Sequence, residues 1–282
     1  NPLSEHPCDR GKVAKQSEGE QMHYLIAGGG DFGTRYLRKL NIARKRRNLP
    51  IESITVIDNN PNCKAKKFVE KIPRAQIEVA DLLEFGNAIW RRRNEFKNAT
   101  WVPAPIAPHI FAHWMKEKLE KEYKVKLTPL VYSWDHVKLP FIKALPDGRL
   151  LLSHAPGMCP VNCTEPADCA ITKGPRWWEM KNTIKEITTN LPQEKSIDYV
   201  AMLFGEHHYG VDGYGVGGIP MNSIYNELDK LSAVARTGKG RIGVATTSSC
   251  HAVVTLFEIQ NLEAVMTQLN NGQKRGNVES YL

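Results

Sequence analysis

The chain has 282 residues, of which 41% are hydrophobic and 24% are charged, and its formal net charge is +8. This length suffices for one large or two ordinary domains and excludes a small fold held together by disulfides. The balance of apolar and charged residues excludes general disorder. No segment approaches the roughly 18 consecutive apolar residues of a membrane-spanning helix, so we expect no membrane insertion.

Residues 1–21 are polar, without a hydrophobic period and without the apolar core of a signal peptide. We therefore expect a mobile leader and a cytoplasmic protein. The positive charge gathers in three clusters, 44–47, 64–67 and 91–93. No nucleic-acid-binding motif accompanies them, so they favour solvated helix faces, then a surface that docks a protein partner, and least of all nucleic acid.

From residue 22 onward, short apolar runs alternate with stretches of helical periodicity. This alternation predicts an α/β fold with a doubly wound, parallel, Rossmann-like sheet over residues 22–134. Expected strands lie at 23–27, 54–57, 76–80 and 100–102, and expected helices at 31–48, 64–71, 82–97 and 109–123.

A second α/β unit is expected at residues 135–282, either as an independent domain or as an extension of the first sheet. It holds a Cys-rich loop at 155–176 and a Gly-rich loop at 205–219. Its expected regular elements are strands at 149–153, 199–204 and 242–246 and helices at about 177–190 and 221–236, with a further strand at 128–133 preceding it.

A glycine cluster, GGGDFG, occupies residues 28–33. Gly28, Gly30 and Gly33 match the dinucleotide-binding pattern G-x-G-x-x-G, and Asp31 and Phe32 lie between the last two. The cluster follows an apolar strand and opens a helix, so its backbone N–H groups can hold a pyrophosphate. The alternative is a turn that only caps the helix and binds nothing.

Asp58 ends the second expected strand, 25 residues beyond Gly33. A carboxylate at this position can accept the ribose hydroxyls of an adenosine and repels a 2′-phosphate, which favours NAD over NADP. Asn59, Asn60 and Lys64 follow closely and can soften that preference.

Three segments, YLIAGGGDFG, VIDNNP and VADLLEF, resemble the NAD-binding Rossmann domains of potassium-uptake regulators, the TrkA N-terminal type. The resemblance covers residues 23–110 and not the second half. It implies that Asp58 binds ribose and that Asp81 lies near the adenine. The glycine turn alone is also similar to that of the dehydrogenases of siroheme synthesis.

Cys159, Cys163 and Cys169 fall within eleven positions of a proline-rich loop. In a chain without a secretion signal, such cysteines indicate metal or redox chemistry more than disulfides. A fourth ligand could come from Cys250, and His251 and His154 are further candidates. An iron–sulfur cluster, a zinc site and unligated cysteines in a rigid loop all remain open.

Cys250 follows Thr247-Ser248-Ser249, which suits a helix N-cap and would lower the pKa of the thiol. The residues after it, AVVTLFEIQ, are equally compatible with a strand, which would leave a buried, inert cysteine. His251, and His208 in the Gly-rich loop, are candidate proton-transfer groups. We expect Trp101, Trp177 and Trp178 to be core or interface anchors rather than platforms for base stacking.

Together these patterns predict an NAD(P)-binding oxidoreductase with a cysteine-ligated iron–sulfur or zinc centre, acting on a small molecule or a redox protein. The alternative is a dinucleotide-sensing regulator, or a subunit of a larger redox complex, in which the metal loop is structural. A homo-oligomer is compatible with either function.

Overall fold

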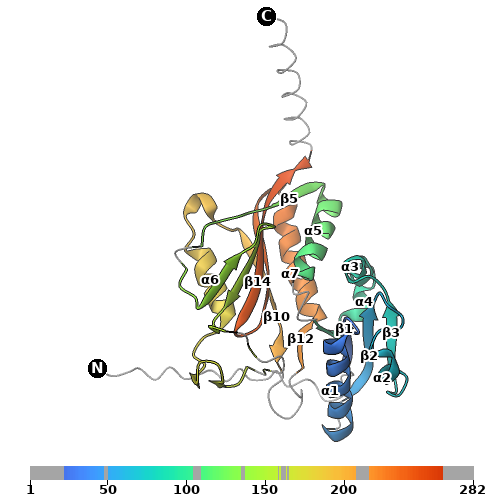
Figure 1. Ribbon diagram of the computed structural model, residues 1–282. Coiled ribbons are helices and arrows are strands. Elements are labelled where there is room, and N and C mark those ends of the chain that lie inside the picture. Colours follow the sequence, from blue (N-terminus) through green and yellow to red (C-terminus); the bar gives the residue numbers. More distant parts are fainter. Residues whose placement is uncertain are drawn as a thin grey trace, which may run out of the picture.

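The computed structural model describes residues 22–47, 50–103, 109–134, 137–157, 159, 163, 165–207 and 216–262. These residues form two six-stranded sheets and one two-stranded sheet, accompanied by helices (Figure 1). The protein therefore has the mixed α/β class that the sequence predicts. The leader expected at residues 1–21 lies outside the described residues.

The first sheet contains four parallel strands in the order β3-β2-β1-β4. Beyond β4, the strands β12 and β11 continue the sheet in antiparallel pairings. The central strands β1 and β2 are apolar along most of their length because helices cover both of their faces. The strands are β1 (Met22–Ala27), β2 (Ile51–Asp58), β3 (Ala75–Val79), β4 (Ala99–Val102), β11 (Glu206–His207) and β12 (Gly217–Pro220).

The parallel strands are joined by α1 (Asp31–Arg47), α2 (Lys66–Val69), α3 (Leu82–Arg91) and α4 (Arg93–Phe96). The helices α1 and α2 pack on one face of the sheet, and α3 packs on the other. The single helix expected at 82–97 is interrupted at Arg92, whose dihedral angles (φ −96°, ψ 24°) leave the helical region.

The second sheet has the order β10-β13-β14-β7-β6, and β5 pairs with the end of β14. Only β10 and β13 run parallel; all other pairings are antiparallel. The segment AVVTLFEIQ forms most of the long strand β14, so the strand alternative holds there. The strands are β5 (Val125–Pro129), β6 (Phe141–Ala144), β7 (Arg149–Ser153), β10 (Tyr199–Phe204), β13 (Lys239–Thr247) and β14 (His251–Asn261).

Helices cover the two faces of the second sheet differently. The amphipathic α6 (Met180–Thr189) packs on one face, and a short 3₁₀ helix, η1 (Gln193–Lys195), follows it. On the other face lie α5 (Ile110–Tyr123) and α7 (Met221–Ala235). A small sheet of β8 (Asp168–Cys169) and β9 (Gly174–Pro175) lies within the cysteine segment.

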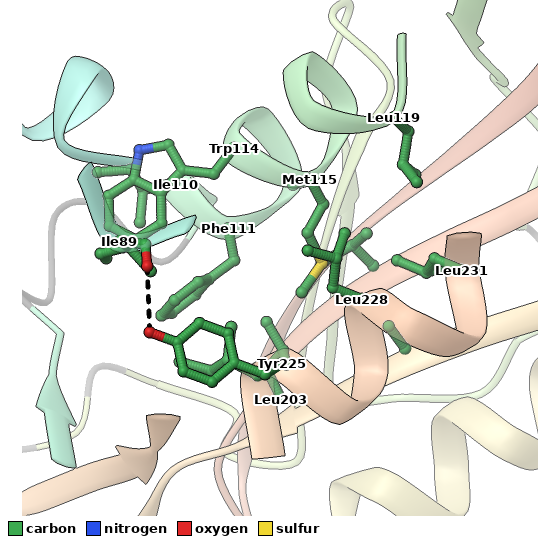
Figure 2. Close-up of a cluster of buried hydrophobic side chains, with 14 of the residues drawn as sticks. Ile89, Ile110, Phe111, Trp114, Met115, Leu119, Leu203, Tyr225, Leu228 and Leu231 are labelled. Carbon is green, nitrogen blue, oxygen red and sulfur yellow. Dashed lines mark hydrogen bonds between the residues drawn. The ribbon is translucent and has the colours of Figure 1, made fainter. Parts of the chain in front are cut away.

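The helices α5 and α7 lie between the two sheets, and their apolar side chains fill the space there (Figure 1). One hydrophobic cluster accordingly contains Trp101 of the first sheet and Val244 of the second. Figure 2 shows part of it, including the hydroxyl of Tyr225, which donates to the carbonyl oxygen of Ile89 at 3.3 Å. The two sheets therefore share one continuous core.

The sheets also exchange strands across residue 134, the predicted end of the first domain. The strand β5 precedes that residue but belongs to the second sheet, whereas β11 and β12 follow it but belong to the first. The division between the sheets therefore does not coincide with the predicted division of the chain. None of the helices in the described ranges is both long and apolar enough to cross a membrane.

Candidate functional site

The glycine turn, residues 28–33, joins the carboxyl end of β1 to α1. Gly28 has a φ of 81°, and its N–H donates to the carbonyl oxygen of Ile57 at 2.8 Å. Gly33 lies in the first turn of α1, where an added Cβ would stand 1.8 Å from the carbonyl oxygen of Gly28. Glycine at position 28 thus permits the positive φ of the turn. Glycine at position 33 allows the helix and the turn to approach each other.

Neither the backbone conformation nor close packing requires a glycine at position 30. An added Cβ at this exposed residue would meet no atom within 4 Å, and the residue directly precedes α1. Open space beside the backbone at a helix N-terminus is the environment in which a phosphate group can contact N–H groups. The structure therefore leaves room for a ligand where the sequence pattern predicts one.

Asp58 ends β2, and its carboxylate faces the glycine turn. One carboxylate oxygen accepts the N–H of Gly29 at 2.6 Å, and the other accepts the N–H of Asn60 at 2.8 Å. The fold thus brings the predicted ribose-binding acid to the predicted phosphate-binding turn. Each carboxylate oxygen retains a second lone pair that can accept a hydroxyl of a ligand.

The other residues predicted to bind the dinucleotide lie around this turn or at the neighbouring strand end. Asp31 and Phe32 open α1, the first exposed and the second half-buried. The Asp31 carboxylate accepts from the Lys64 ammonium at 2.9 Å, an exposed pair of small energetic value. Asn59 is exposed beside Asp58, and Asp81 caps the N-terminus of α3.

The second candidate site forms where the cysteine segment, residues 155–176, meets the turn between β13 and β14. Burial raises the pKa of the Cys159 thiol to about 11, and the nearby charges of Cys163 and Cys169 add to the increase. Cys169 packs with Cys250 of the β13–β14 turn in one small apolar cluster. Hydrogen bonding by the Thr172 backbone lowers the pKa of the Cys169 thiol. The four cysteines predicted as metal ligands therefore share one region.

Cys250 has a different environment from the helix N-terminus that its flanking hydroxyls suggested. The strand β14 begins at His251, so no helix dipole acts on the thiol, and the predicted low pKa is wrong. Burial instead raises the pKa of Cys250 to about 12. The indole N–H of Trp178 donates to its sulfur at 3.3 Å.

Glu165 connects the cysteine segment to the β13–β14 turn. Its side chain is 5% exposed, and its carboxylate accepts the N–H of Ser249 at 2.9 Å, the N–H of Cys250 at 3.1 Å and the hydroxyl of Ser248. Its φ of 51° is unfavourable for a residue with a side chain. The sequence analysis missed this residue; an acid beside Pro166 within the cysteine segment was the available signal.

Two of the predicted histidines, His251 and His154, lie beside the cysteine region. His251, the first residue of β14, places its Nδ1 3.9 Å from a carboxylate oxygen of Glu165. The backbone N–H of His154 donates to the carbonyl oxygen of Cys250 at 3.0 Å, and its ring Nε2 lies 2.9 Å from the Thr183 hydroxyl. Burial lowers the pKa of His154. His208 lies outside the described residues.

Within the part of the chain that the structure describes, no three His, Cys, Asp or Glu side chains lie close enough together to hold one metal ion. A tetrahedral zinc ion requires its sulfur ligands within about 2.3 Å of one point. The thiols here influence one another's ionisation without converging to that degree. The region thus offers four separated thiols around a buried carboxylate.

The segment from β10 to β12 connects the two candidate sites along the chain. The parallel strands β10 and β13 end side by side, and the N–H of Gly205 donates to the carbonyl oxygen of Thr247 at 2.8 Å. The chain then continues through β11, which pairs with β12 in the first sheet. The predicted Gly-rich loop at 205–219 therefore begins beside the cysteine region and returns to the first sheet, while its residues 208–215 lie outside the described ranges.

These features define an α/β protein with a glycine turn on its first sheet and a cysteine region on its second. The chain belongs to the AF_1314_C family, whose model, described as "Uncharacterized protein, C-terminal domain", matches residues 111–260, more than half of the chain. The match includes the four cysteines of the second site and excludes the glycine turn. No match was found among curated proteins or among solved structures.

Proposed function

We propose that this protein is an NAD(P)-binding oxidoreductase whose first sheet is a Rossmann-like, doubly wound dinucleotide domain of the TrkA N-terminal type. The parallel order β3-β2-β1-β4 supports this proposal because the first half of a dinucleotide-binding sheet has the same order. Helices on both faces, α1 and α2 on one and α3 on the other, support it further.

The observation that carries the proposal is the contact of the Asp58 carboxylate with the N–H of Gly29. It joins the acid at the end of β2 to the turn after β1, where a dinucleotide places its ribose and its pyrophosphate. The open space at Gly30, beside this acid, supports the proposal further.

In this function the N-terminus of α1 and the backbone of Gly30 bind the pyrophosphate, with Lys64 supplying a nearby cation. Asp58 accepts ribose hydroxyls and disfavours a 2′-phosphate, so NAD is the preferred cofactor. When bound, the nicotinamide supplies hydride transfer. His251, half-exposed beside Glu165, is the described group best placed to hold or move a proton near the cysteines.

For the cysteine region we propose an iron–sulfur cluster held by Cys159, Cys163, Cys169 and Cys250. A cluster keeps its ligands apart by its own width, which suits thiols that share one environment without meeting at a point. A single zinc ion needs closer convergence and is the second choice. The raised pKa values of Cys159 and Cys250 are those of the metal-free thiols, and a bound cation would favour their thiolates.

A dinucleotide-sensing regulator, alone or within a larger redox complex, is the second candidate function. One observation favours it: the hydrophobic cluster around α5 and α7 contains side chains of both sheets, so a change in the first sheet can reach the second. In that case the metal loop would be structural, and nucleotide binding would change conformation or oligomeric state without turnover.

The first experiment is anaerobic purification, followed by iron and acid-labile sulfide analysis and visible spectra before and after addition of NADH. We expect iron with sulfide, and partial bleaching by NADH, which would show electron transfer from nucleotide to cluster. A cluster that NADH does not bleach would favour the sensor. Zinc alone, or the absence of metal, would contradict the cluster.

A second experiment separates nucleotide binding from the metal. NADH and NADPH are titrated into the unaltered protein, and we expect at least tenfold weaker binding of NADPH because its 2′-phosphate would face Asp58. The Gly30→Val variant should fold normally and lose NADH binding, since its side chain would occupy the open space. Gly157→Val, at another glycine without neighbours, is the matched control. Normal NADH binding by Gly30→Val would contradict the phosphate-binding turn.

A further inference from the structure

A cavity of about 610 Å³ lies beside the cysteine region, on the outer side of Trp178. Its walls include Trp177, Trp178 and His154, together with three prolines. Its polar lining residues include Lys138 and Thr172. This volume and this combination of apolar walls with a few polar groups are typical of sites for small molecules.

The aromatic walls are arranged as a corner. The rings of Trp177 and Trp178 are nearly perpendicular, at 83°, with centroids 5.7 Å apart. His154 lies nearly parallel to Trp178, at 19° and 5.3 Å. A flat ligand can therefore stack on the exposed indole of Trp177, with Trp178 and His154 forming the adjoining wall.

Trp177 is 83% exposed, unlike Trp178, which is 7% exposed. Of the three tryptophans expected to be anchors, Trp101 and Trp178 are part of the core and Trp177 is not. Trp177 therefore presents its ring to solvent at the rim of the cavity, where a ligand can cover it.

Lys138 gives the cavity its charge. Its ammonium is exposed and, among the residues that the structure describes, forms no ion pair. One cation beside flat apolar walls favours a flat ligand with a negative group.

We infer that this cavity binds a planar aromatic anion. Trp178 forms one wall and also donates its indole N–H to Cys250, so such a ligand would lie one side chain away from the proposed cluster. Binding itself is independent of the proposed function. Only the statement that the ligand lies near a cluster rests on that function.

The test is calorimetric titration of the full chain with 2-naphthoate, without nucleotide. We expect saturable one-to-one binding. The neutral 2-naphthamide should bind about fivefold more weakly, because it lacks the charge that meets Lys138, an exposed interaction of modest strength. Cyclohexanecarboxylate should bind at least tenfold more weakly, because it cannot stack. Equal binding of all three compounds would overturn the inference, as would no binding of any.

Variants locate the site. Trp177→Ala should weaken 2-naphthoate binding at least tenfold, and Trp177→Phe should restore most of it. Lys138→Met should bring naphthoate to the affinity of the amide, whereas Lys143→Met, an exposed lysine on β6, should change nothing. An unchanged affinity in both Trp177→Ala and Lys138→Met would place binding elsewhere and overturn the assignment. Iron content and NADH affinity, measured on the same samples, report separately on the proposed function.

Discussion

The glycine turn and the cysteine region both follow the carboxyl end of a strand, but they differ in the groups that form them. The turn is mostly backbone, and its contact from Gly29 to Asp58 joins residues 29 positions apart at the ends of neighbouring strands. The cysteine region is mostly side chains, and its central contact, from Cys250 to Glu165, spans 85 positions.

This difference determines which substitutions should disrupt each region. A backbone site tolerates no added atom where two main-chain segments touch, so a single methyl group can destroy it. A side-chain site with a buried carboxylate fails when its hydrogen-bond donors lose their acceptor. The predictions below contrast the two modes of failure, from the largest effect to the smallest.

The largest effect is expected for Gly33→Ala. In a helix this change normally stabilises by about 1 kcal/mol, but here the new Cβ would stand 1.8 Å from a main-chain oxygen. We expect the clash to dominate and to lower the free energy of unfolding by more than about 4 kcal/mol. Urea titration followed by circular dichroism measures this change.

Gly30→Ala is the control for that experiment, because its Cβ would meet nothing within 4 Å. It should change the free energy of unfolding by less than about 1 kcal/mol. Comparable stabilities of the two variants would show that the turn is looser than described.

Glu165→Ala should be the next most damaging change. It leaves two buried backbone N–H groups and the Ser248 hydroxyl without their acceptor, and we expect a loss of about 3 kcal/mol in the free energy of unfolding. Glu165→Gln keeps one carbonyl oxygen and should lose roughly half as much. Glu186→Ala, at an exposed acid on α6, should be nearly neutral. A loss in Glu165→Ala as small as in this control would refute the connecting role of Glu165.

Trp178→Phe tests the link between the aromatic cavity and the cysteines. It removes the indole N–H that donates to Cys250 while keeping an aromatic wall. Hydrogen bonds to ligand sulfur stabilise the reduced, more negative cluster, so the reduction potential of the iron-loaded protein should fall. Spectroscopic redox titration measures this shift. Trp90→Phe on α3 is the control, and an equal shift there would remove Trp178 from the cluster's surroundings.

The smallest effect is expected for Tyr225→Phe, which tests whether the two sheets share one core. The variant loses a single long hydrogen bond between α7 and α3 (Figure 2), worth about 1 kcal/mol. Urea unfolding should remain a single transition whether it is followed by circular dichroism or by tryptophan fluorescence. Two separate transitions would contradict the shared core.

Local patterns in the sequence predicted much of the fold. The strands β7 and β10 have the predicted bounds, 149–153 and 199–204, because short apolar runs between turns leave few alternatives. The turn at β14 shows the limit of such patterns. Ser248 and Ser249 suit a helix cap, but the ladder to β7 and β13 forms a strand instead, since pairing on both sides outweighs a local cap.

The glycine turn could be predicted from the residues alone, because glycine acts through its own backbone and Asp58 lies at the end of the adjacent strand. The surroundings of the cysteines could not, since they depend on contacts between distant segments. Glu165, Trp178 and Cys250 meet through the pairing of β14 and the docking of the cysteine segment. The physical reason is burial: the raised pKa of the Cys250 thiol comes from its removal from water, which no local pattern encodes.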